Sequence, residues 1–145
     1  MRISNHLLRI ANKTMRLLLN THILLRALDT PSRLPQMLRT QLESPLVEVY
    51  FSAASIWEIA IKSALGKVKF HYSAKEIADG AGMTGFIELP VSSEHAAGVA
   101  HLPMLHTDPF DRLLIAQALA MPARLVTADA ALVGYSELID WIGRP

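Results

Sequence analysis

The stretch MRLLLN, residues 15–20, is the clearest indication of the fold. Leu17, Leu18 and Leu19 form an unbroken apolar run that ends at the polar residue Asn20. A strand with one solvent-exposed face alternates apolar and polar residues, whereas an unbroken run is typical of a strand covered on both faces of a parallel sheet. We therefore predict a buried parallel strand here, with Asn20 at its carboxyl end.

Short strand-like runs alternate with longer helical runs along the rest of the chain. This alternation is typical of a three-layer α/β/α sandwich with a mostly parallel sheet and right-handed crossovers. The further predicted strands are 47–51, 86–89, 124–127 and 138–142. The predicted helices are 22–28, 32–42, 52–66, 73–81, 92–101 and 108–120, with a short helical turn over 130–133.

Composition limits the class of protein. The chain has 145 residues, of which 51% are apolar and 19% charged, and this predicts one globular domain. The absence of cysteine excludes disulfides and cysteine-based zinc sites and favours a reducing compartment. A formal net charge of +1 argues against binding of nucleic acid by a bulk positive field alone. A metal-assisted nuclease is still compatible with this net charge, because its bound ion adds positive charge that the residue count omits.

Residues 1–14 differ from the rest of the chain in charge. They contain Arg2, Arg9 and Lys13 and no acidic residue. We interpret 1–14 as an N-terminal extension upstream of a natural start at Met15, and 15–145 as the domain. A membrane span needs about 20 mostly apolar residues, and the sequence has neither such a run nor a signal-peptide core. We therefore expect a cytoplasmic protein without a membrane segment.

Polar residues from distant positions are predicted to meet at the carboxyl edge of the sheet. Asn20 and Asp129 follow predicted strands, Glu58 and Asp111 lie in the first turns of helices that begin at this edge, and Asp108 is close by. Ligands of open parallel sheets bind at this edge. Carboxylates that repel one another gather either to bind a hard cation or to share a proton. Mg²⁺ or Mn²⁺ fits best, because such ions take oxygen ligands.

Each carboxylate also has a structural alternative. An aspartate before a proline is a good helix N-cap, and a glutamate four residues before a lysine forms a favourable pair on a helix surface. The alternatives are a cap at Asp108 completed by Asp111, a cap at Asp129, a pair between Glu58 and Lys62, and a capping box from Ser55 to Glu58. Individually the structural roles are favoured. Their meeting at the one edge where ligands bind favours a site.

Four separated motifs resemble the PIN-domain toxins of VapC type. They are MRLLLNTHILLRAL (15–28), SAASIWEIAIKSALGK (52–67), DPFDRLLIAQA (108–118) and LVTAD (125–129). The resemblance runs in order from Met15 to about Trp141. It implies an α/β/α fold, metal-dependent endoribonuclease activity, a homodimer, and a cognate VapB-type antitoxin that occupies the acidic groove.

The resemblance also implies a role for each residue of the acidic group. Asn20, Glu58, Asp111 and Asp129 take the metal-binding positions, the last three are catalytic, and Asp108 is accessory. The family pattern has Asp where this chain has Asn20. An amide carries no charge and cannot act as a base, so we expect weaker Mg²⁺ binding and attenuated cleavage of RNA. The alternative is a catalytically inactive PIN-fold protein that binds antitoxin or RNA without cleaving.

Further predictions concern residues around this group. Thr127 is expected either to hydrogen-bond the waters of the metal or to be structural. Arg112 is expected to pair with a carboxylate or to contact RNA phosphate, with the ion pair favoured. The six histidines are scattered without ligand spacing, and His22 is the only one expected near the site. Trp57 is expected to fill core or dimer surface. A phospho-receiver domain, which shares the fold class, fits poorly because it needs an acidic pair at position 20 and the residue after it.

Overall fold

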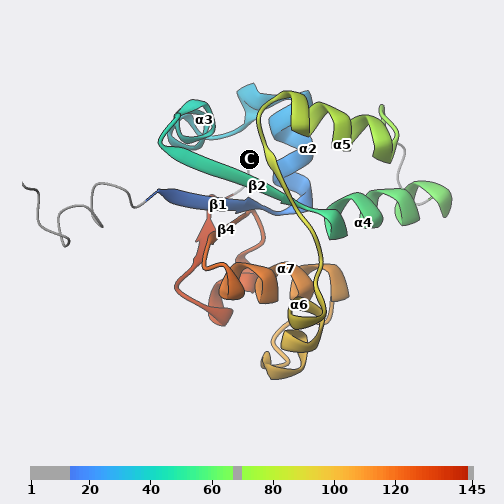
Figure 1. Ribbon diagram of the computed structural model, residues 1–145, viewed down its shortest axis with the longest axis vertical. Coiled ribbons are helices and arrows are strands. Elements are labelled where there is room, and N and C mark those ends of the chain that lie inside the picture. The colour runs from blue at the N-terminus through green and yellow to red at the C-terminus, as the bar shows by residue number, and fades with distance from the viewer. Residues whose placement is uncertain (1–13, 67–69, 144–145) are drawn as a thin grey trace, which may run out of the picture.

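The computed structural model describes residues 14–66 and 70–143, and the predicted extension over 1–14 lies outside them except for Thr14. The described strands form one sheet in the order β3-β2-β1-β4-β5, and every neighbouring pair is parallel (Figure 1). The strands are β1 (Met15–Leu19), β2 (Val47–Ser52), β3 (Ile87–Leu89), β4 (Arg124–Thr127) and β5 (Ile139–Trp141). The predicted α/β fold with a mostly parallel sheet is confirmed.

Strand β1 lies in the middle of the sheet, between β2 and β4. Its side chains point alternately to the two faces, as strand geometry requires. Leu17 and Leu19 belong to one hydrophobic cluster and Leu18 to the other, and all three are fully buried. The unbroken leucine run therefore has the predicted cause, which is helices on both faces of the sheet.

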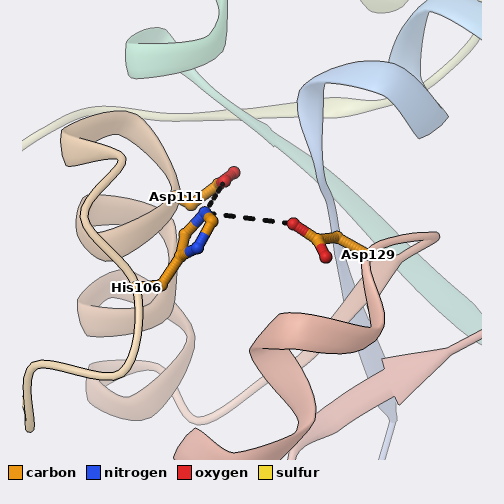
Figure 2. A group of neighbouring side chains, drawn as sticks. All are labelled: His106, Asp111 and Asp129. Carbon is orange, nitrogen blue, oxygen red and sulfur yellow. Dashed lines mark hydrogen bonds and ion pairs between the residues drawn. The ribbon is translucent and has the colours of Figure 1, made fainter.

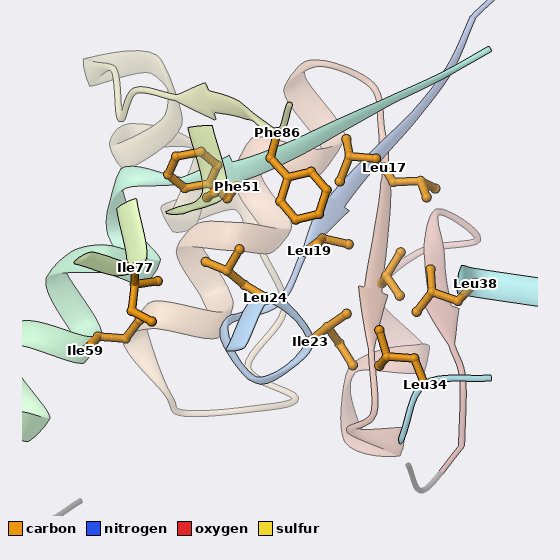
Figure 3. Packing of buried hydrophobic residues seen from close by; sticks show 13 residues of the cluster. Leu17, Leu19, Ile23, Leu24, Leu34, Leu38, Phe51, Ile59, Ile77 and Phe86 are labelled. Atoms are coloured by element: carbon orange, nitrogen blue, oxygen red, sulfur yellow. The ribbon is translucent and has the colours of Figure 1, made fainter. Parts of the chain in front are cut away.

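The first helical layer consists of α2 (Thr21–Asp29), α3 (Gln36–Glu43) and α5 (Ala74–Met83), and a short 3-10 helix (Pro31–Arg33) follows α2. These three α-helices lie on the same side of the sheet (Figure 1). Figure 3 shows how side chains of β1, β2 and these helices interdigitate there. Full burial of one such aliphatic side chain contributes about 1.5–3 kcal/mol. This packing holds the end of β1 and the start of α2 in place.

The second layer consists of α6 (Ser93–Gly98) and α7 (Pro109–Ala120) on the opposite side of the sheet (Figure 1). Helix α4 (Ala53–Ala64) begins directly after β2 and contacts α5 and α7, one from each layer. Two further 3-10 helices cover Val99–His101 and Ala130–Tyr135. Within residues 14–66 and 70–143, we find no helix with the length and apolar character needed to cross a membrane.

The strand order explains where a ligand can bind. The chain leaves β1 for β2 on one side and later enters β4 on the other side of β1, so the direction of winding reverses between β1 and β4. In open parallel sheets, ligands bind outside the carboxyl ends of the strands at such a reversal. Asn20 follows β1 and Asp129 comes shortly after β4, so both lie beside it.

Some predicted helix boundaries were wrong. The helix predicted over 32–42 begins at Gln36, because Pro35 stands immediately before it and Leu34 is extended, with φ −86° and ψ 149°. A proline ring disfavours the helical conformation for the residue before it. The helix predicted over 92–101 ends as an α-helix at Gly98 and continues as a 3-10 turn to His101.

Candidate metal and active site

A cavity of about 500 Å³ opens at the carboxyl edge of the sheet. Its lining includes every residue predicted to gather there: Asn20, Glu58, Asp108, Asp111 and Asp129. Strands β1 and β4 end at this cavity, and helix α7 begins there. The edge argument therefore predicted the grouping of these side chains correctly.

Asn20 connects the end of β1 to α7. It is 6% exposed and is the N-cap of α2, since its Oδ1 accepts a hydrogen bond from the His22 backbone N–H at 3.2 Å. Its Nδ2 donates to Oδ1 of Asp111 at 3.0 Å. An ionised aspartate at position 20 could keep the cap but could not donate the second bond. The Asn20 amide therefore accepts from the backbone of α2 and donates to Asp111 at the same time.

Glu58 lies in a buried polar network at the other end of the cavity. Its Oε1 is 2.7 Å from the hydroxyl of Thr21, and its Oε2 pairs with the ammonium of Lys62. The Thr21 hydroxyl is also 2.8 Å from that of Ser55. An ionised carboxylate only accepts, so Thr21 donates to Glu58 and Ser55 donates to Thr21. The hydrogen bond to Glu58 is the main cause that raises the pKa of Lys62, against the opposing effect of burial.

The predicted capping box from Ser55 to Glu58 is wrong. Ser52 is the N-cap of α4, and its hydroxyl accepts from the Ala54 backbone N–H at 3.0 Å. Ser55 is already inside the helix and is fully buried. The predicted pair between Glu58 and Lys62 is confirmed, although Glu58 is buried and does not lie on a solvated helix face.

Asp108 and Asp111 have different roles at the start of α7. Asp108 is the predicted N-cap, because its Oδ1 accepts from the backbone N–H groups of Phe110 and Asp111 at 2.9 and 3.0 Å. The carboxylate of Asp111 faces the cavity instead, with Oδ1 on Asn20 and Oδ2 3.0 Å from Nε2 of His106. Asp111 therefore does not complete a cap on Asp108.

The environment of Asp111 disfavours its negative charge. Burial is the main cause that raises the pKa of Asp111, and the charge of Asp108 acts in the same direction. Hydrogen bonds from His106 and Asn20 oppose this shift only in part. A cation in the cavity would remove the penalty, because an opposite charge favours the ionised form.

Asp129 is held by the loop that follows β4. Its Oδ1 accepts from the Ala131 backbone N–H at 2.9 Å, so the predicted cap at Asp129 is confirmed. Thr127, which is 1% exposed, accepts from the Asp129 backbone N–H at 3.0 Å. This contact supports the structural alternative for Thr127. The second oxygen of Asp129, Oδ2, is 3.9 Å from Nε2 of His106.

His106 is the residue that sequence reasoning missed. It precedes α7, and Nε2 of its ring faces the carboxylates of both Asp111 and Asp129 (Figure 2). One ligand atom from each of these three residues lies within 4.8 Å of the others, a grouping that could hold a metal ion. His22 lines the cavity as predicted but is not in this group. The available signal was the position of His106 five residues before Asp111, in the loop that leads to the same helix.

Comparison with known proteins identifies the family. A family model described as PIN domain matches residues 17–138. The chain belongs to the PIN domain family. The predicted membership is thereby confirmed, and the match covers most of the sequence. A comparison with curated proteins found no match.

Two solved structures resemble this PIN domain. One is a chain of VapBC2 from Rickettsia felis bound to a DNA fragment from their promoter, with a TM-score of 0.63, 16% identity, and coverage of 90% of this chain and 100% of that chain. The other is a chain of FitAcB from Neisseria gonorrhoeae, with a TM-score of 0.49, 19% identity, and coverage of 79% and 88%. At 16% identity, the likeness to the first shows a common fold.

Arg112 of the PIN domain has a role that the sequence did not indicate. It is 8% exposed, and it donates to the backbone carbonyls of Val99 and Pro103 at 3.2 and 2.8 Å and to the hydroxyl of Tyr135 at 3.2 Å. It pairs with no carboxylate in the described part of the chain, so the favoured ion pair is wrong. Its burial also removes the alternative contact with RNA phosphate. Arg112 instead fixes the loop that carries His106.

Proposed function

We propose that this PIN domain is a metal-dependent endoribonuclease of the VapC type that hydrolyses RNA phosphodiesters. The observation that carries the proposal is the position of Asp111 and Asp129, which direct their Oδ2 atoms into one cavity at the carboxyl edge. The burial of Asp111, which its hydrogen bonds from His106 and Asn20 offset only in part, supports a cation there. Membership of the PIN domain family supports a nuclease.

Asp111 and Asp129 are the residues that would hold the ion, with Mg²⁺ or Mn²⁺ as the predicted cofactor. When bound, a divalent cation stabilises the charge that develops on a phosphodiester during hydrolysis. Thr21 and Lys62 hold the carboxylate of Glu58 beside the cavity. This carboxylate can accept a hydrogen bond from the attacking water and orient it. Asn20 fixes the position of Asp111 rather than adding charge.

The proposed partners follow from the family resemblance. A cognate VapB-type antitoxin would occupy the acidic cavity and block RNA, and the enzyme would act in the cytoplasm. Trp57, which is 60% exposed and lies edge-on against Phe110 with ring centres 5.4 Å apart, offers apolar surface for a homodimer. Light scattering of the purified protein measures this dimer, and Trp57→Ser is expected to weaken it.

A catalytically inactive binding protein is the second candidate. The observation in its favour is the hydrogen bond from Asn20 to Asp111, which partly satisfies that carboxylate without a metal. This candidate predicts that the protein with Asn20 binds antitoxin or RNA and cleaves no RNA at any metal concentration.

A cleavage assay separates the two candidates. A broad panel of RNAs is incubated with the protein and Mg²⁺ or Mn²⁺, with EDTA and with Asp111→Ala as controls. The endoribonuclease proposal predicts cleavage that both controls abolish, and higher activity for Asn20→Asp, which adds the carboxylate that the family pattern has. If a correctly folded Asn20→Asp protein cuts no RNA in the panel, the endoribonuclease proposal fails.

A further inference from the structure

Two distances from the ring of His106 fit the spacing of ligands on one metal ion. Ligands about 2.0–2.1 Å from an octahedral ion lie about 3 Å apart when they are adjacent and about 4 Å apart when they are opposite. Nε2 of His106 is 3.0 Å from Oδ2 of Asp111 and 3.9 Å from Oδ2 of Asp129. The side chain of Asp129 is 47% exposed, which gives it room to adjust. One ligand atom from each of the three residues lies within 4.8 Å of the others, so the three side chains can surround one ion.

Both carboxylates divide their oxygens in the same way. Oδ1 of Asp111 accepts from Asn20, and Oδ1 of Asp129 accepts from the Ala131 backbone N–H. In each case Oδ2 is the oxygen that faces the imidazole of His106 (Figure 2). Ligands oriented by hydrogen bonds to their other atoms are characteristic of metal sites in proteins. The Oδ2 atoms of both aspartates are therefore oriented by hydrogen bonds from outside the group.

The backbone of His106 is also fixed. Its carbonyl accepts from Nη1 of Arg112 at 3.4 Å and from the hydroxyl of Tyr135 at 3.3 Å. Arg112 holds the carbonyl of Pro103 in the same loop at 2.8 Å. The ring of His106 thus comes from a loop with buried hydrogen-bond support, and it is not a free surface side chain.

We propose that His106 binds the cation through Nε2, and that this site prefers a transition ion such as Co²⁺ or Zn²⁺ over Mg²⁺. The inference rests on the metal site of the proposed function and specifies its ligands and its metal class. Imidazole nitrogen suits Zn²⁺ and related transition ions, whereas Mg²⁺ favours carboxylate, carbonyl and water oxygens. Asn20 has no charge to attract a hard ion. The ligand is the neutral imidazole with its proton on Nδ1, so a neutral ring protonated on Nε2 moves that proton to Nδ1 through solvent, and an imidazolium releases the Nε2 proton to solvent.

Calorimetric titration of the full chain with Co²⁺ and with Mg²⁺ tests the preference. We expect Co²⁺ to bind at least about 10-fold more tightly, and His106→Gln to remove most of this difference. His22→Gln is the matched control, because His22 lines the same cavity outside the three-residue group. Equal affinity for the two ions in the wild-type protein would overturn the preference.

Pulsed electron paramagnetic resonance of the Mn²⁺-loaded protein tests direct ligation. Affinity alone is insufficient, because loss of a group that only orients a ligand also costs about 10–100-fold. We expect a ¹⁴N coupling to the Mn²⁺ signal, which is replaced by a ¹⁵N coupling when the protein is labelled with [¹⁵N]histidine. This coupling should persist in His22→Gln and disappear in His106→Gln. The measurement on the labelled wild-type protein does not depend on whether any variant folds. Absence of the coupling, its persistence in His106→Gln, or failure to bind Mn²⁺ would each overturn the inference.

The outcomes separate this inference from the proposed function. A histidine coupling without cleavage of RNA would support the nitrogen ligand and contradict the endoribonuclease proposal. Cleavage of RNA with Mg²⁺ but without a histidine coupling would support the endoribonuclease proposal and contradict the nitrogen ligand.

Discussion

The negative charges on the two sides of the carboxylate cavity have different partners. On the Glu58 side, which comprises Thr21, Ser55, Glu58 and Lys62, both carboxylate oxygens have partners and one partner is a lysine ammonium. On the Asp111 side, which comprises Asn20, His106, Asp111 and Asp129, no lysine or arginine of the described residues pairs with either aspartate.

The difference indicates where an added cation would be stabilised. A cation near Glu58 would compete with Lys62 for a charge that is already neutralised. A cation between Asp111 and Asp129 would relieve the burial that raises the pKa of Asp111. This difference supports our proposal that the Asp111 side binds the metal and that the Glu58 side has a structural and water-orienting role.

The largest expected effect is on metal affinity, at Asp111. We expect Asp111→Ala to weaken binding of Co²⁺ by about 100-fold or more, because changes that only misorient a ligand already cost about 10–100-fold. Calorimetry measures this loss. Asp79→Ala is the matched control, since it removes the same charge from an exposed pair with Lys75. An unchanged affinity in Asp111→Ala would remove the Asp111 side as the metal site.

At Glu58 the larger effect is expected on stability. Glu58→Gln breaks the partly buried pair with Lys62 and disturbs the buried hydrogen bond from Thr21, so we expect a loss of about 1–2 kcal/mol in the free energy of unfolding, because solvent at Lys62 screens part of the pair. Urea denaturation in EDTA measures it, with Asp79→Asn as the control for an exposed pair that contributes little. A loss of metal affinity as large as that of Asp111→Ala, without loss of stability, would reverse the assignment of the two sides.

Asn20→Asp should make the Asp111 side depend on metal for stability. The substitution replaces a hydrogen bond of 3.0 Å by two facing carboxylates, while an aspartate can still cap α2. We expect a loss of about 1–2 kcal/mol in EDTA and a larger gain on addition of metal than in the wild-type protein. Thermal unfolding with and without metal measures both. Greater stability of Asn20→Asp in EDTA would contradict this account of Asn20.

The smallest effect is a pH dependence at Asp111. Because burial raises the pKa of Asp111 in the folded chain, its protonated form favours folding. Stability from this residue is full below its unfolded pKa of about 3.9 and is lost as pH rises through the raised folded value. Asp111→Asn cannot ionise, so in EDTA it should be more stable than the wild-type protein at neutral pH and equal to it in acid. A difference that does not change with pH would contradict the effect of burial.

The sequence predicted the positions that depend on topology alone. Parallel strands place their carboxyl ends at one edge, so Asn20, Glu58, Asp111 and Asp129 could be grouped without knowledge of any loop. His106 could not, because its position depends on the path of the loop before α7. That path depends on the buried guanidinium of Arg112, a charged residue type that is rarely buried and was expected to form an ion pair.

The most direct test of the account is the position of a bound ion. Crystals of the full chain grown with Mn²⁺ and measured at its absorption edge would locate the ion by anomalous scattering. We predict one peak within about 2.5 Å of Oδ2 of both Asp111 and Asp129, with the pair between Glu58 and Lys62 intact. A peak on Glu58 that displaces Lys62, with none between the two aspartates, would contradict the assignment of metal binding to the Asp111 side.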